Sequence, residues 1–252
     1  MKITEKQFWD NFWGDIKLPV KVDYKFKNDR VIANLIKKFI PINHESETMI
    51  EIGCAPGKWL VFFNKELNYK VIGLEYLESA AQKTRDNLVL SEVSNFEIIN
   101  ADFFDYKKPE QYNVVCSLGF VEHFTDWESV LDKHIEMCQR LGYIVIGFPC
   151  FKGINYYLQK ILDKYIDQPL IPSHNLKIMD LKTVKKYVDE CNVDLLFLNY
   201  IGGFEPALFD VRVGNKFLSL FFKIIIKGLS IIFGNFNSKY TSSYIMLVIK
   251  KK

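Results

Sequence analysis

The stretch Met49-Ile50-Glu51-Ile52-Gly53-Cys54-Ala55-Pro56-Gly57 decides the fold of this chain. An apolar run over residues 48–52 ends in a turn with two glycines, and a segment with helical spacing of apolar residues begins at Lys58. A buried strand that ends in such a turn and opens a helix places free backbone N–H groups at the carboxyl edge of a sheet, where open α/β sheets bind ligands. Small residues in the turn let a ligand approach the backbone. The stretch therefore predicts a ligand-binding turn in an α/β fold.

Short apolar runs alternate with helical patterns on both sides of this turn. The predicted strands are residues 48–52, 69–74, 96–99, 112–117, 143–148, 193–201 and 243–250. The predicted helices among them are residues 23–39, 58–66, 77–90 and 127–140. Strands that alternate with helices indicate parallel strand–helix–strand units. We therefore expect an α/β fold, with a Rossmann-like, seven-stranded, mostly parallel sheet and helices on both faces.

The predicted organisation is a single domain over residues 1–252. Its core covers about 26–150 and 190–252, and residues 1–25 form an N-terminal cap. Two segments, 150–180 and 202–237, interrupt the alternation and are too long for simple connections, so they are predicted to be inserted helical lid elements.

The composition excludes several classes of protein. A net charge of +3 lacks the basic excess of a nucleic-acid-binding protein, so no nucleic-acid partner is expected. The five cysteines are scattered without Cys-x-x-Cys spacing, which predicts reduced thiols and no metal site. Reduced thiols and an N-terminus without a signal-peptide pattern favour a cytoplasmic location.

The turn differs from two well-known nucleotide-binding motifs. A dinucleotide fingerprint is Gly-x-Gly-x-x-Gly, but Ala55 and Lys58 stand where its second and third glycines belong. The Gly-Lys-Ser/Thr of an ATP-binding loop is also missing from the turn. What is left, Glu51-x-Gly53-x-Ala55-x-Gly57, resembles the first motif of the class I S-adenosylmethionine-dependent methyltransferases.

Further elements match that family in its own order. Glu75 ends the second predicted strand, about 20 residues past the turn, and Asp102-Phe103 follows the third. Ser117-Leu118-Gly119-Phe120-Val121-Glu122-His123-Phe124 resembles the fourth motif, and residues 140–149 resemble the segment around the fifth strand. The layout also resembles bacterial methyltransferases that act on glycans and small molecules.

The resemblance implies S-adenosyl-L-methionine as the cofactor. Glu51 would hold the amino group of its methionine part, and Glu75 would accept hydrogen bonds from the ribose hydroxyls. Asp102 would accept from the adenine amine, while Phe103 packs on the ring. The expected cofactor-binding residues are Glu51, Gly53, Cys54, Ala55, Gly57, Glu75, Tyr76, Asp102, Phe103, Ser117 and Leu118.

The candidate catalytic residues are Glu122, His123 and His174. Methyl transfer to a hydroxyl benefits from a base within hydrogen-bond reach, and an unperturbed histidine pKa near ~6.5 suits such a base. Glu122 and His123 follow the fourth strand, close to the expected methyl group. The alternative is that one of them packs beneath the cofactor or caps the helix that begins near Asp126. His174 lies beside Asn175 in the first insertion.

Two segments outside the strands carry aromatic or apolar side chains. Trp9 and Trp13 lie on one helical face and would either cover the cofactor pocket or pack on the sheet. Residues 217–233 are apolar with a stripe of lysines and serines, which predicts an amphipathic helix. That helix is expected to be buried against protein, with a dimer contact or peripheral binding at the inner face of the membrane as the other options.

The expected activity is methyl transfer to a hydroxyl of a small molecule, with a sugar or surface-glycan precursor in polysaccharide biosynthesis as the first choice. Two alternatives stay open. Residues 55–59 resemble a segment of RNA ribose methyltransferases, although Ser117-Leu118 stands where those enzymes carry an aspartate. A non-catalytic subunit that binds the cofactor and activates a partner is the second.

Overall fold

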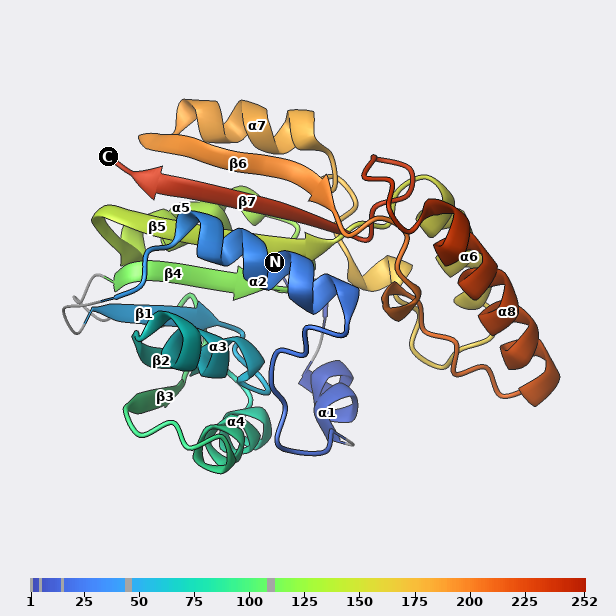
Figure 1. Cartoon of the computed structure of the whole chain (residues 1–252), viewed down its shortest axis with the longest axis horizontal. Helices are drawn as coiled ribbons and strands as arrows, with labels where there is room; N and C mark the ends of the chain where they lie inside the picture. Colours follow the sequence, from blue (N-terminus) through green and yellow to red (C-terminus); the bar gives the residue numbers. More distant parts are fainter. Residues whose placement is uncertain (1, 5, 15, 44–46, 108–111) are drawn as a thin grey trace.

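The computed structural model describes residues 2–4, 6–14, 16–43, 47–107 and 112–252. Its centre is a seven-stranded sheet in the order β3-β2-β1-β4-β5-β7-β6 (Figure 1). The strands are β1 (Thr48–Ile52), β2 (Lys70–Glu75), β3 (Phe96–Asn100), β4 (Tyr112–Leu118), β5 (Cys138–Pro149), β6 (Val193–Ile201) and β7 (Tyr244–Lys251). Strands β1 to β5 pair in parallel, and β7 is antiparallel to both β5 and β6. The predicted Rossmann-like, mostly parallel sheet is confirmed.

The predicted helices are present with shifted ends, and α7 (Leu181–Glu190) is a helix that was not predicted. They are α1 (Lys6–Gly14), α2 (Lys27–Phe39), α3 (Lys58–Leu67), α4 (Glu78–Leu90), α5 (Trp127–Met137), α6 (Ile154–Leu162), α7 (Leu181–Glu190) and α8 (Lys216–Phe233). Short 3₁₀ helices η1 (Val121–His123), η2 (Ile171–Ser173) and η3 (Pro206–Leu208) lie between them. Helix α2 begins four residues later than predicted, because the Asp23 carboxylate accepts a hydrogen bond from the Lys25 N–H and holds a turn there.

The predicted helix over 127–140 is wrong at its end. Helix α5 ends at Met137, and Cys138 already belongs to β5, where it pairs with Tyr112 of β4. A Cβ on Gly142 would lie 2.7 Å from Cys138 Sγ and 2.8 Å from the Asn113 carbonyl oxygen. A glycine at that place lets the strand approach its neighbour, which a helical spacing of apolar residues does not reveal.

The sheet has one apolar cluster on each face. On β1, Ile50 and Ile52 belong to the cluster that includes α5 and α7 residues, whereas Met49 belongs to the cluster of α2 and α3. This alternation is the period of two expected of a strand, and it sends Glu51 to the same face as Met49. The ligand-binding turn therefore follows a strand that is anchored on both faces.

The two insertions meet in a separate lobe beyond the end of β5, where α6 and α8 lie side by side (Figure 1). Their buried side chains form a third apolar cluster that includes Leu162, Phe209, Phe222 and Ile226. The expectation that α8 is buried against protein holds only for its inner side, where Phe222 and Ile226 are buried, because six of its apolar side chains are exposed. Among the described helices, none is both long and apolar enough to cross a membrane.

Candidate active site

The turn after β1 has the geometry that its glycines predict. Gly53 has a φ of 66° and Gly57 has a φ of 88°, both in the left-handed region that favours glycine. A Cβ on Gly53 would lie 2.8 Å from the Phe120 ring, and one on Gly57 would lie 2.9 Å from Thr84 Cγ2. The missing side chain at Gly57 therefore lets α3 pack on α4. The missing side chain at Gly53 leaves room for Phe120 beside the cavity in front of the turn.

We call this the first cavity. It has a volume of about 60 Å³ and lies against the ends of β1, β2 and β4. Four of the predicted cofactor-binding residues line it: Gly53, Glu75, Tyr76 and Phe103. The other lining residues are Lys2, Thr4, Trp9, Trp13, Ile52, Leu74, Ala101, Gly119, Phe120, His123 and Phe124. Trp9 and Trp13 line this cavity, so of the two alternatives for them the structure has a cover over the turn.

Glu75 is the buried carboxylate of the first cavity. Its Oε1 accepts a hydrogen bond of 3.1 Å from the Leu77 N–H. Burial raises the pKa of Glu75, while backbone donors from Leu77, Ala55 and Tyr76 oppose that shift. A carboxylate held in this way at the end of a second strand can accept from the two hydroxyls of a ribose.

Glu51 lies behind the turn and lines neither of the two cavities described here. It is buried, and its Oε2 has no hydrogen-bond partner within the described chain. Burial raises the pKa of Glu51 well above its usual range, with the charge of Lys58 opposing the shift. An unpaired buried oxygen beside the turn fits the expected contact with an amino group, directly or through water.

Four other predicted cofactor-binding residues line neither cavity: Cys54, Gly57, Asp102 and Ser117. The Ser117 hydroxyl lies 3.0 Å from His134 Nε2 of α5, so it points away from both cavities. Asp102 is paired with Lys2, although its neighbours Ala101 and Phe103 line the first cavity. Cys54 is fully buried, as expected of a structural thiol.

A second cavity of about 600 Å³ lies between the turn and the lobe. It is lined by Gly53, Ala55 and Leu118 of the predicted cofactor set and by all three predicted catalytic residues. Five residues line both cavities: Trp9, Trp13, Gly53, Gly119 and His123. A chemical group transferred between molecules bound in the two cavities would therefore move past these five residues.

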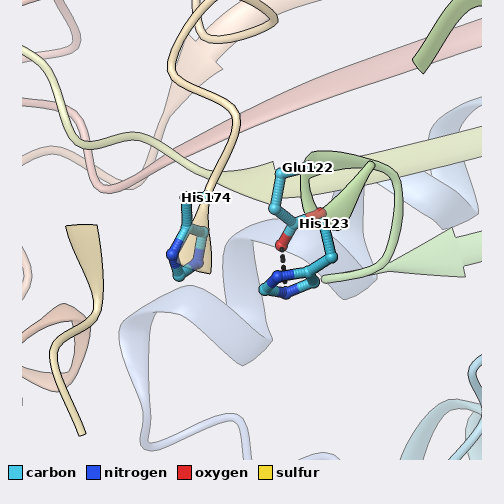
Figure 2. Close-up of side chains that lie close together, drawn as sticks. All are labelled: Glu122, His123 and His174. Carbon is cyan, nitrogen blue, oxygen red and sulfur yellow. Dashed lines mark ion pairs between the residues drawn. The ribbon is translucent and has the colours of Figure 1, made fainter. Parts of the chain in front are cut away.

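Glu122, His123 and His174 converge in the second cavity, although His174 lies some fifty residues further along the chain (Figure 2). Glu122 Oε1 is 3.5 Å from His123 Nε2, and the two imidazole centroids are 4.8 Å apart. Their ligand atoms lie within 4.8 Å of one another, so this cluster could also hold a metal ion. The expectation that the chain has no metal site stays a prediction.

Backbone hydrogen bonds hold this cluster from two sides. The Ile3 N–H donates to the His123 carbonyl at 2.8 Å, and the Asn175 N–H donates to the Glu122 carbonyl at 2.7 Å. His123 Nδ1 is 2.7 Å from the Ser173 carbonyl oxygen. A carbonyl only accepts, so His123 Nδ1 carries the proton and Nε2 presents a lone pair to Glu122.

Burial controls the protonation of all three side chains. It raises the pKa of Glu122 to about 8 and lowers that of His123 to about 3, with the neighbouring His174 as a second cause. It also lowers the pKa of His174 to about 4. The sequence-based expectation that His123 keeps an ordinary pKa is therefore wrong, and Glu122 is the group in the cavity whose pKa lies near neutrality.

Some residues of the site gave no signal in the sequence. The wall of the second cavity opposite the cluster is residues 207–212, which precede α8. Lys2 and Thr4 line the first cavity and are placed there by a bridge between Lys2 and Phe124. Neither group belongs to a motif, because their position depends on how distant segments pack.

Comparison with known proteins identifies the family. A family model described as a methyltransferase domain matches residues 24–190, more than half of the chain. The chain belongs to this methyltransferase family. The resemblance to the S-adenosylmethionine-dependent class I methyltransferases is thereby confirmed.

Relatives of this methyltransferase include enzymes with different acceptors. The mitochondrial ubiquinone biosynthesis O-methyltransferase of Dictyostelium discoideum is 24% identical over 195 residues, which is 70% of this chain and 59% of that protein. (S)-coclaurine N-methyltransferase of Thalictrum flavum subsp. glaucum is 20% identical over 151 residues, 59% of this chain and 42% of that protein. The chain thus spans only 42% and 59% of the length of these two curated relatives.

The fold is shared with solved methyltransferases. Phosphoethanolamine N-methyltransferase 2 of Haemonchus contortus superposes with a TM-score of 0.64 at 11% identity, over 88% of this chain and 52% of that one. A SAM-dependent methyltransferase of Archaeoglobus fulgidus superposes with a TM-score of 0.54 at 18% identity, over 98% and 100%. At these identities the likeness concerns the fold.

Proposed function

We propose that this methyltransferase transfers the methyl group of S-adenosylmethionine to a hydroxyl of a small acceptor held in the second cavity. The observation that carries the proposal is the junction of the two cavities at His123, directly beside the buried Glu122. S-adenosylmethionine, when bound, supplies a methyl group on a sulfonium. The chain's own residues must then hold the acceptor in line and receive its proton.

The lining of the first cavity suits the nucleoside part of the cofactor. Glu75 can accept from the ribose hydroxyls, and the ring of Phe103 offers a stacking surface for a base. Trp9 and Trp13 cover this site from the N-terminal helix and also line the second cavity. Their rings are stacked, with centroids 6.2 Å apart, so they form one apolar wall that helps to exclude water from the junction.

Glu122 is the residue that we assign as the base. Its carboxylate lines the second cavity, its Oε2 has no partner in the described chain, and burial makes it a stronger base than an exposed carboxylate. His123 is a positioning residue at the junction, because its Nδ1–H is committed to the Ser173 carbonyl and its ring stands edge-on to Trp9 at 4.9 Å. His174 completes the polar end of the cavity.

The test separates cofactor binding from turnover. Binding of S-adenosylhomocysteine by calorimetry should be micromolar-range for wild type and nearly unchanged for His123→Ala and Glu122→Gln. Incorporation of labelled methyl into a panel of sugars, sugar nucleotides and phenols should fall by about two orders of magnitude or more in Glu122→Gln. A panel in which no hydroxyl compound is methylated by wild type would overturn the hydroxyl assignment.

Methylation of an amine is the second candidate. Two of the matched relatives are named as N-methyltransferases, and a buried carboxylate such as Glu122 can pair with a protonated amine. The same panel, extended with amines, decides between methylation of a hydroxyl and methylation of an amine. A sugar or surface-glycan precursor is our first choice among hydroxyl compounds, and the RNA and non-catalytic alternatives predict, respectively, labelled RNA and binding without turnover.

A further inference from the structure

Helix α8 carries a concentration of exposed apolar side chains. Phe217 is 87% exposed and Ile231 is 78% exposed, in a helix where only Phe222 and Ile226 are buried. The exposed large apolar residues of this helix are Phe217, Leu220, Phe221, Ile224, Ile231 and Ile232. A patch of this kind marks a surface that meets something other than water.

The side chains of α8 divide into three strips along the helix. At 100° per residue, the six exposed apolar residues span an arc of roughly 120°. Phe222 and Ile226 lie on the opposite side, where they pack in the cluster of the lobe. Lys216, Lys223 and Lys227 fall in one narrow row between these two strips. A helix with one face packed on protein, an apolar outer face and lysines along its edge has the pattern of a helix that lies in a membrane interface.

Charge around this helix favours an anionic surface. Residues 211–243, the segment that carries α8, include four Lys and one Arg but no Asp or Glu, and the one Arg is paired with Asp210. The whole chain has a net charge of only +3, so the segment around α8 is more positive than the rest of the chain. In a symmetric dimer with the two α8 helices antiparallel, the lysine rows of the two copies would approach one another, which disfavours a second copy as the occupant.

We propose that the outer face of α8 docks this methyltransferase on a membrane with anionic lipids. The apolar strip would enter the boundary between headgroups and acyl chains, and the lysine row would lie at the level of the phosphates. Aromatic residues follow the helix on the same segment of chain, with Phe236 and Tyr240 both exposed. Such residues are typical of the membrane–water interface.

The docked helix is connected to the second cavity by the packing of the lobe. Phe209 packs in one cluster with Phe222 and Ile226 on the inner side of α8, and Phe209 also lines the second cavity. The segment 207–212 that forms one wall of this cavity leads directly into α8. We infer that the acceptor is amphiphilic, with a lipid tail in the membrane and the methylated hydroxyl on its polar head. This assignment of substrate class rests on the proposed function, whereas the docking does not.

The experiment is flotation of the full chain with vesicles. Vesicles of phosphatidylcholine alone are compared with vesicles that contain about one third phosphatidylglycerol. We expect binding at least tenfold stronger to the anionic vesicles, since each lysine near such a surface strengthens binding by about fivefold. The double variant Lys223→Gln, Lys227→Gln should therefore lose more than tenfold of this binding.

A matched pair of variants tests the apolar strip. Ile231→Asp on α8 should abolish flotation, whereas Val89→Asp, at an exposed aliphatic position on α4, should float like wild type. Both variants should bind S-adenosylhomocysteine as wild type does, which shows that they are folded. Absence of anionic-vesicle binding by wild type, or equal flotation of the two variants, would overturn the docking. A wild-type dimer that Ile231→Asp converts to monomers would show that a second copy covers the helix instead.

Flotation needs neither cofactor nor acceptor, so its result is independent of the proposed reaction. If the protein floats and a lipid-linked hydroxyl compound is not methylated, the docking stands and the acceptor assignment fails. If wild type methylates soluble sugars and does not float, the proposed function stands and the docking fails.

Discussion

Replacement of the buried Glu122 by Gln tests the electrostatics of the site most directly. The side chain is 1% exposed, and its Oε2 has no partner among the described residues. His123 presents a lone pair to Oε1 across 3.5 Å, so a protonated carboxyl group is favoured over a carboxylate when the site is at rest. Gln keeps the size of the side chain and removes its titration.

The magnitude follows from the pKa of Glu122, which burial raises from 4.5 to about 8. In the unfolded chain the carboxyl group ionises near pH 4.5, whereas in the folded chain it keeps its proton until about pH 8. The folded state therefore binds more protons in this window, and the free energy of unfolding falls as pH rises through it. The loss is about 1.4 kcal/mol per pH unit, or roughly 5 kcal/mol over the window.

Urea denaturation of wild type and Glu122→Gln between pH 5 and pH 8.5 measures this effect. The stability of wild type relative to the variant should fall steadily with pH and level off above about pH 8. Glu78→Gln, at an exposed position on α4, should follow wild type at every pH. In parallel, kcat/KM of wild type should rise with pH and be half-maximal near pH 8. A stability difference that stays constant across the range would show that Glu122 is ionised in the folded protein at neutral pH, and it would refute the reasoning.

Three further predictions concern the cofactor, the turn and the cluster. Glu75→Ala should weaken S-adenosylhomocysteine binding by about tenfold to hundredfold in calorimetry, because two hydrogen bonds to a charged group are lost, while Glu78→Ala should leave it unchanged. Gly57→Ala should lower the free energy of unfolding by roughly 2–3 kcal/mol, since it combines a φ of 88° with a contact of 2.9 Å to Thr84; an unchanged denaturation midpoint would contradict this. Dialysis against a chelator should leave methyl transfer unaltered; a tenfold loss that Zn²⁺ restores would show that the cluster of Glu122, His123 and His174 holds an ion.

Local sequence was sufficient for most elements of the core. The predicted strands 48–52 and 193–201 coincide with β1 and β6, and helix α5 begins where Asp126 caps it. These elements are predictable because burial on a sheet and hydrogen bonding at a helix end act over a few neighbouring residues. Glu75 could be found in the same way, since the length of one strand–helix–strand unit sets its distance from the turn.

Other features depended on packing between distant segments. The spacing that predicts a helix through Arg140 gives no sign that Cys138 pairs with Tyr112, because strand pairing is non-local. Ser117 stands in the expected motif, but its hydroxyl is bonded to His134 of α5. The direction in which a side chain points at a strand end depends on which neighbour offers a partner.

The sequence alone determined that the stretch from Glu51 to Gly57 ends a buried strand in a glycine turn of the methyltransferase type, because that signal lies in residue size and spacing. Only the tertiary structure decided which acidic and imidazole groups share a cavity. Glu122 and His174 meet because an insertion folds back over the end of β4, and their burial there shifts both pKa values away from those of isolated side chains. Likewise, the apolar pattern of 217–233 predicted a helix, but its exposed face was decided by how little of the lobe packs against it. Proximity and desolvation arise from the fold as a whole, and no window of sequence contains them.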